Sequence, residues 1–124
     1  MDVLVVTLFD IPHVGGLSTH VQLLLDGLRR RGDSVRLIEG GRSRVGKWRK
    51  ALHYAAAGFD RDRYRVRVLR NRLRLVADAV AAEVRRRRPD VIHSHDALAS
   101  AAVATAQLTH PMPPLIQTVH GPAL

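Results

Sequence analysis

The 124-residue sequence contains no cysteine, and only 4% of its residues are aromatic. Without cysteine, the chain can form neither a disulfide framework nor a thiolate zinc site. Its apolar runs are far shorter than the ~20 residues that span a bilayer. No stretch near its start combines the basic, apolar and small-residue parts of a secretory leader. These absences argue against a disulfide-stapled secreted domain and a membrane span, and we expect a cytoplasmic location.

What the sequence does contain is enough apolar material for one folded domain and an uneven excess of basic charge. Hydrophobic residues make up 46% of the chain, and the formal net charge is +9. The interval from Arg42 to Arg74 holds 12 Lys and Arg residues against Asp60 and Asp62, a local charge of +10, while the remainder sums to −1. A basic insert of about residues 41–70 in an otherwise neutral domain indicates a local anionic partner or a solvated surface.

Apolar runs and helical spacings alternate along the chain. Short apolar runs predict four strands, in 3–8, 34–38, DVIHSHD (90–96) and LIQTVHG (115–121). Apolar residues at helical spacing predict three helices, over 17–31, 71–88 and 97–108. Thr19 and Gln22 have capping-box spacing at the start of the first helix, and Gly32 is placed to end it.

The basic insert does not follow this alternation clearly. KWRKALHYAAAGF, residues 47–59, has the spacing of a basic amphipathic helix, whereas YRVRVL, residues 64–69, alternates like a strand. Strands that alternate with helices predict an α/β, Rossmann-like, doubly wound parallel sheet with helices on both faces. With right-handed crossovers the expected strand order is 3-2-1-4-5, which places the first strand beside the VIHSH strand.

The predicted order brings distant residues to one place, because ligands bind such sheets outside the carboxyl ends of the strands. Gly15 and Gly16 follow the first strand, His95 and Asp96 end the VIHSH strand, and His120 ends the last strand. Adjacent glycines at a helix start let backbone N–H groups approach an anion closely. We therefore expect a ligand site at this edge.

Each of these residues also has a purely structural interpretation. The glycine pair could only shape a turn, and Asp96 could cap the helix that starts at Ala97. His93 is expected to be a core histidine bonded to the backbone. His93 and His95 share a strand face, but no third ligand is evident in the sequence, so we predict no metal site.

A nicotinamide dinucleotide site is the lesser alternative. Glu39 supplies an acid 23 residues after Gly16, at the end of the second predicted strand. The fingerprint for that cofactor is G-x-G-x-x-G directly after the strand. Here the glycines are adjacent, a long loop precedes them and no third glycine follows, so we expect no such cofactor.

Four motifs taken together, GGLSTHV, LRRRGDSVRLI, PDVIHSHD and TVHG, resemble the N-terminal domain of GT-B glycosyltransferases of the family 4 type. The resemblance covers nearly the whole chain except the basic insert. It implies retaining transfer of a sugar from a nucleotide-diphospho-sugar donor to an acceptor hydroxyl, in a cleft between two Rossmann-like domains. Residues 1–124 correspond to one of these domains. The C-terminal nucleotide-sugar domain is absent from them, so we expect no turnover by this segment alone.

The resemblance also implies roles for the residues at the sheet edge. Gly15 and Gly16 match the loop that approaches the donor diphosphate and the transferred sugar. His120 matches the histidine that bonds the transferred sugar or sits at the reaction centre. His95 and Asp96 match acceptor-side positions of the cleft. No metal or other cofactor is implied.

The basic insert matches the position where membrane-associated relatives carry a cationic amphipathic patch. Aromatic residues among cations suit contact with anionic lipid at the inner membrane face, and the candidate patch consists of Arg44, Lys47, Trp48, Arg49 and Lys50. The alternative function is a stand-alone module that binds nucleic acid or another anion, but RNA-binding signatures are missing. The last predicted strand is an unprotected edge, so we also expect dimerisation there.

Overall fold

The computed structural model describes residues 1–8, 16–40 and 47–118, with the backbone alone for 16–18, 47, 49 and 50. The elements follow in the order β1 (Asp2–Val6), α1 (Gly16–Arg30), β2 (Ser34–Ile38), α2 (Lys47–Ala56), α3 (Arg61–Arg86), β3 (Val91–Ser94), α4 (Ala97–Gln107) and β4 (Leu115–Gln117). All paired strands are parallel, in the order β2-β1-β3-β4. The predicted neighbourhood of the first strand and the VIHSH strand is confirmed.

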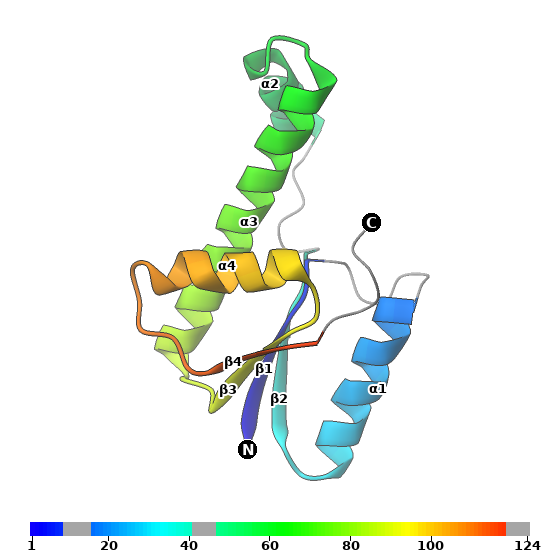
Figure 1. The fold of residues 1–124 in the computed structure, drawn as a ribbon, viewed down its shortest axis with the longest axis vertical. Coiled ribbons are helices and arrows are strands. Elements are labelled where there is room, and N and C mark those ends of the chain that lie inside the picture. Colours follow the sequence, from blue (N-terminus) through cyan, green and yellow to red (C-terminus); the bar gives the residue numbers. More distant parts are fainter. Residues whose placement is uncertain (9–15, 41–46, 119–124) are drawn as a thin grey trace.

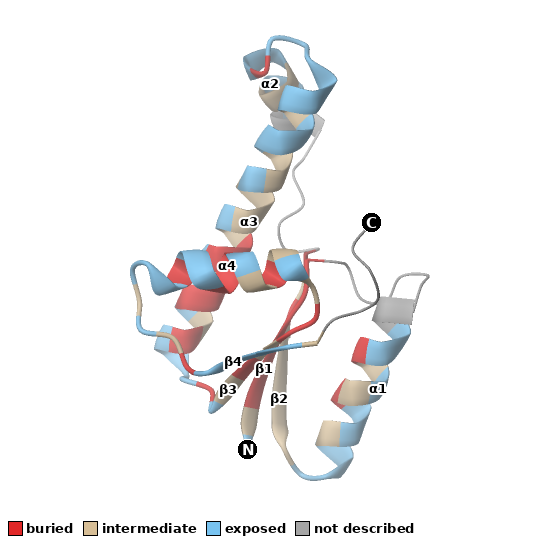
Figure 2. Ribbon diagram, viewed as in Figure 1, coloured by how far each residue is buried: buried red, intermediate tan, exposed pale blue. Residues whose placement is uncertain are grey.

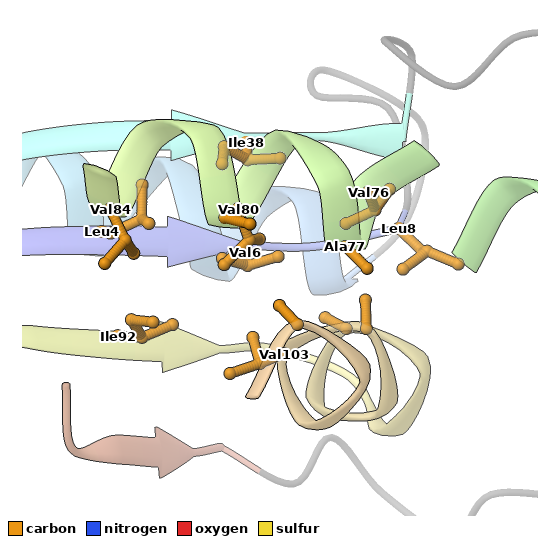
Figure 3. Packing of buried hydrophobic residues seen from close by; sticks show 14 residues of the cluster. Leu4, Val6, Leu8, Ile38, Val76, Ala77, Val80, Val84, Ile92 and Val103 are labelled. Carbon is orange, nitrogen blue, oxygen red and sulfur yellow. The ribbon is translucent and has the colours of Figure 1, made fainter. Parts of the chain in front are cut away.

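The sheet is covered on both faces because successive residues of β1 point to opposite sides. Leu4 and Val6 pack with Ile38 and with residues of α3 and α4, as Figure 3 shows. Val3 and Val5 pack on the other face with Val21 and Leu25 of α1. The predicted doubly wound α/β architecture is therefore confirmed (Figure 1).

Helix α1 ends as the sequence predicts. Gly32 has a φ of +91°, and the N–H groups of Gly32 and Asp33 donate to the carbonyls of Arg29 and Leu28. Its start differs from the prediction: the helix begins at Gly16, so Thr19 lies inside it and the proposed capping box with Gln22 is wrong.

The predicted strand over 64–69 is also wrong, because those residues lie within α3. Asp60 caps this helix, accepting hydrogen bonds from the backbone N–H groups of Asp62 and Arg63. The helix therefore starts before the alternating segment, and it runs on into the periodic segment that predicted a start at 71. In the described part of the chain, the sheet has four strands rather than five.

The helices α2 and α3 form a hairpin whose outer part, residues 47–72, we call the arm. Gly58 and Phe59, with φ of +67° and +59°, make the turn, and the Tyr54 hydroxyl donates to the Phe59 carbonyl at 3.0 Å. At the base of the arm, Arg72 Nη2 donates to the Leu8 carbonyl at 2.9 Å, just after β1. Because α3 passes the carboxyl edge of the sheet at Arg72, the residues before it project beyond that edge (Figure 1).

Candidate functional site

Three histidine rings stand in a row at the carboxyl edge of the sheet. The His95 ring stacks on the His93 ring, with centroids 4.3 Å apart, and lies 5.6 Å from the His20 ring of α1. His95 is fully buried, directly after β3. The row therefore links α1 to the end of β3.

His93 continues the row to the last strand. Its Nε2 lies 2.6 Å from the hydroxyl of Thr118, and the Thr118 N–H donates to the carbonyl of Ser94. The expected shared face of His93 and His95 is confirmed by their stacking. Thr118 directly follows β4, and the backbone bond of His93 stays a prediction.

Asp96 joins the ends of two elements. Its Oδ1 accepts from the Ala99 N–H at 2.6 Å and caps α4, while its Oδ2 accepts from the Thr7 hydroxyl at 2.9 Å and the Leu8 N–H at 3.1 Å. Both carboxylate oxygens are thus engaged with the protein. This geometry agrees with the predicted capping role and fixes the chain as it leaves β1.

Three further polar side chains run across the same edge. The Ser94 and Ser100 hydroxyls are 2.6 Å apart, and Ser100 donates to Gln117 Oε1, also at 2.6 Å. They come from β3, α4 and β4. Hydroxyl and amide groups of this kind can orient a polyhydroxylated ligand without ionising.

Within the described ranges, no group of three or more histidine or acidic side chains is arranged to hold a metal ion. Stacked imidazoles do not aim their lone pairs at one point, which explains why three neighbouring histidines make no such site. The arrangement can bind anions at the α1 terminus and orient hydroxyl groups along the row. Both are requirements of group transfer to a hydroxyl.

The profile of glycosyltransferase family 4 matches residues 14–124. The chain belongs to this family. No curated protein and no solved structure matches the chain significantly. The match includes the arm, and membership favours a transferase over both a stand-alone nucleic-acid module and a dinucleotide-binding domain.

The structure describes some of the predicted site residues of the family 4 domain but not all of them. Gly16 is the first residue of α1, and His95 and Asp96 lie together after β3. Gly15 and His120 fall outside the described residues. Thr118, two positions before His120 in the sequence, is bonded into the sheet at this edge.

Sequence reasoning missed His20. The residue is exposed on α1, as its place in the sequence suggests, and its ring also lies 5.6 Å from that of buried His95. The available signal was its place in GGLSTHV, directly before Val21, which packs on the sheet. A helix position next to a core position lies close enough to the sheet edge to reach it.

The candidate membrane patch is described in part. Trp48 is 86% exposed on α2. Lys47, Arg49 and Lys50 lie in the same helix, and Arg44 lies outside the described residues. None of the described helices is both long enough and apolar enough to cross a bilayer.

Proposed function

We propose that this family 4 domain is the acceptor-side half of an enzyme that moves a sugar from a nucleotide-diphospho-sugar to an acceptor hydroxyl, with retention of configuration. The observation that supports this proposal is the gathering of the α1 start, buried His95 and the end of β4 at one sheet edge. Such a transfer needs groups that stabilise the departing diphosphate and groups that orient the acceptor.

Gly15 and Gly16 are proposed to let backbone N–H groups close on the donor diphosphate. The first turn of a helix has N–H groups without intrahelical partners and carries about half a positive charge. In the full-length protein, Gly16→Val should block donor binding through its Cβ bulk while leaving the fold intact. Gly27→Val, in an open position of the same helix, is the matched control and should keep donor binding.

His120 is proposed to bond the transferred sugar in the transition state. His120→Ala in the full-length protein should then lower kcat and kcat/KM together, by about 10² to 10⁴. His110→Ala is the matched control, since His110 follows α4 at the opposite end of the sheet. Steady-state kinetics paired with thermal melts separate this role from a structural one. Unchanged turnover in His120→Ala would overturn it.

His95 and Asp96 are proposed to form the acceptor side. Because both oxygens of Asp96 already accept hydrogen bonds from Ala99, Thr7 and Leu8, its part is to hold the wall of the cleft. The His95 ring, flanked by His20 and His93, lines that wall.

We propose that the base and ribose of the donor are held by a second domain, as the family resemblance implies. The 124 residues alone should then bind free nucleotide weakly and should not turn over. Calorimetry with a free nucleoside diphosphate tests this. Micromolar affinity for the 124-residue chain would place the nucleotide site in this domain instead.

We also propose a cytoplasmic location with peripheral contact to an anionic membrane through α2. Trp48 and Leu52, 86% and 69% exposed, stand one helical turn apart in a basic helix. Co-sedimentation with phosphatidylglycerol-containing vesicles should be reduced in the variant Trp48→Ala/Leu52→Ala, and pure phosphatidylcholine vesicles should not bind. Equal sedimentation of variant and wild type would contradict the contact.

The edge strand β4 is proposed as a dimer contact. Leu115 and Ile116 are 41% and 55% exposed there, and an edge strand offers unpaired backbone groups to a second copy. Light scattering should show a dimer that Ile116→Lys weakens. A monomer at high concentration would contradict this proposal.

A further inference from the structure

The arm carries a groove between its two helices that none of the functions above uses. The groove has a volume of 590 Å³, which is in the range of small-molecule sites. Its lining comes from both helices: His53, Ala56, Ala57, Asp62, Arg63, Val66, Arg67, Arg70, Asn71 and Arg74.

Four of the lining residues are arginines on one face of α3. Arg63, Arg67, Arg70 and Arg74 are spaced by four, three and four positions, so they form a row about 16 Å long. Among the described residues, no carboxylate lies within ion-pair distance of any of the four. The row is therefore a concentrated positive charge.

One carboxylate does line the groove, and it lies at its outer end. Asp62 is in the first turn of α3, where a negative charge complements the helix dipole. It faces a row of four cations, so the groove keeps a strong positive balance.

The groove is a defined site, because the two helices that line it are bonded to each other. Arg67 Nε donates to His53 Nδ1 at 3.0 Å, which joins the two helices across it. Because Nδ1 accepts this bond, neutral His53 carries its proton on Nε2 and can donate there. The buried Nδ2 of Asn71, one turn after Arg67, has no hydrogen-bond partner among the described residues. An oxygen-rich occupant would meet donors of three types.

Part of the lining is apolar. Ala56, Ala57 and Val66 contribute carbon surface beside the arginines. An occupant that combines anionic groups with a carbon skeleton suits this mixture better than a simple inorganic ion does.

We propose that the groove between α2 and α3 binds a small molecule that carries two or more phosphate groups. Guanidinium groups bind phosphate oxygens in bidentate pairs, and a phosphate monoester brings up to two charges and three acceptor oxygens. A row of arginines without carboxylate partners in the described ranges is matched by several phosphates. The groove is also far smaller than the path that a long nucleic acid would need.

The test uses the full protein and calorimetry with orthophosphate, pyrophosphate and tripolyphosphate. Affinity should rise with the number of phosphates because more arginines are engaged. Arg63→Gln/Arg70→Gln should weaken tripolyphosphate binding at least tenfold, and it leaves the Arg67–His53 bond in place. Both side chains are exposed, so the variant should melt within a few degrees of the wild type.

Arg61→Gln/Arg65→Gln is the matched control. It removes the same charge from the opposite face of α3, outside the lining, and should change the affinity less than threefold. Arg63→Lys/Arg70→Lys keeps the charge but loses the guanidinium fork, so its affinity should fall between those of wild type and the glutamine variant.

Two further probes identify the source of the phosphates. If vesicles containing phosphatidic acid bind through the same arginine pair and tripolyphosphate does not, the ligand is a lipid headgroup with a single phosphate, and the proposal is overturned. If both glutamine variants lose affinity equally, or a single-stranded oligonucleotide binds with equal sensitivity to both, the charge acts diffusely and the proposal is overturned. The proposal is also overturned if no phosphate probe binds. Because the calorimetry involves no sugar transfer, its outcome is independent of the proposed enzymatic function.

Discussion

The two halves of α3 lie in opposite environments, and the amino half is the richer in arginine, with six arginines over 61–72 against three over 73–86. In the carboxyl half, Val76, Ala77, Val80, Ala81 and Val84 are buried, whereas no residue from Arg61 to Arg72 is. Figure 2 shows the change along the helix. The carboxyl half is held by the sheet, and the amino half stands beyond it.

The arginines of the two halves differ in the same way. At the base, Glu83 pairs with Arg86 at 2.6 Å and with Arg36 at 2.5 Å, and Asp2 pairs with Arg87 at 2.9 Å. The four groove arginines, which lie in or next to the arm, have no carboxylate partner among the described residues. The charges of the arginines at the base are neutralised by carboxylates of the fold. The groove arginines keep a positive charge that is available to an anionic ligand.

The amino half is helical although none of its residues is fully buried, because helix growth is cooperative. Once the packed half has formed, each added residue gains a hydrogen bond without a new nucleation cost. The Asp60 cap and the Tyr54 bond to the turn secure the free end. A helix can thus carry a binding surface well outside the domain that anchors it.

The largest difference in the free energy of unfolding should come from a Val→Asp substitution made once in each half of α3. Val80→Asp places an unpaired charge in a fully buried position and should cost about 4 kcal/mol or more of the free energy of unfolding. Val66→Asp, at a side chain 50% exposed, should change it by less than about 1 kcal/mol. Urea unfolding measures both, and comparable losses would mean that the arm is packed like the core.

The next largest effect on stability should come from Gly40, which lies beside Arg72, where the two halves of α3 meet. A Cβ on Gly40 would lie 1.6 Å from the Leu8 carbonyl oxygen, the group that accepts from Arg72. Gly40→Ala should therefore cost about 2 to 4 kcal/mol. Gly27→Ala, with open space at its Cβ, should instead gain up to about 1 kcal/mol. Thermal melts that rank the two alike would contradict the close approach.

The smallest effect on stability concerns the ion pairs of Glu83 in the carboxyl half of α3. Hydrogen bonds from Arg86, and then from Arg36, lower the pKa of Glu83 from 4.5 to about 2. A lowered pKa stabilises the fold above about pH 4.5, and this contribution is lost as the pH falls toward 2. Glu83→Gln should cost about 1 to 3 kcal/mol at pH 7 and remove that part of the acid sensitivity.

The arm supplies the control for this prediction. Asp62→Asn should change stability by no more than about 0.5 kcal/mol, because Asp62 is exposed in the first turn of α3. Unfolding curves between pH 2 and pH 7 check both variants. An unchanged pH dependence in Glu83→Gln would show that the pairs at the base contribute nothing.

The sheet could be predicted because burial on both faces requires recognisable patterns of apolar residues in the sequence. The continuous apolar run of β1 and the periodic residues Val76 to Val84 are direct consequences of packing. The amino half of α3 has only one residue packed against the core, Leu69, so its short alternation of apolar and basic residues resembled a strand. The decisive signal was local, namely the Asp60 cap before it.

The sequence predicted where in the fold the candidate site lies, but not how its side chains are arranged. Parallel topology brought Gly16 and His95 to one edge, as the order of elements required. The stacking of His93 on His95 and the approach of His20 depend on side-chain directions that no spacing rule fixes. The groove joins side chains from two helices whose relative position the sequence did not indicate.

The central place of β1 in the sheet has a consequence for biosynthesis. β1 is the first strand made, yet its neighbour β3 follows 88 residues later, as the contact of Asp2 with Asp90 shows. At ~5–20 residues per second, a ribosome takes roughly 4 to 18 s to cover that distance. Until α3 and β3 emerge, the Leu4 and Val6 face of β1 has no cover, and the nascent chain must keep this apolar face from other chains.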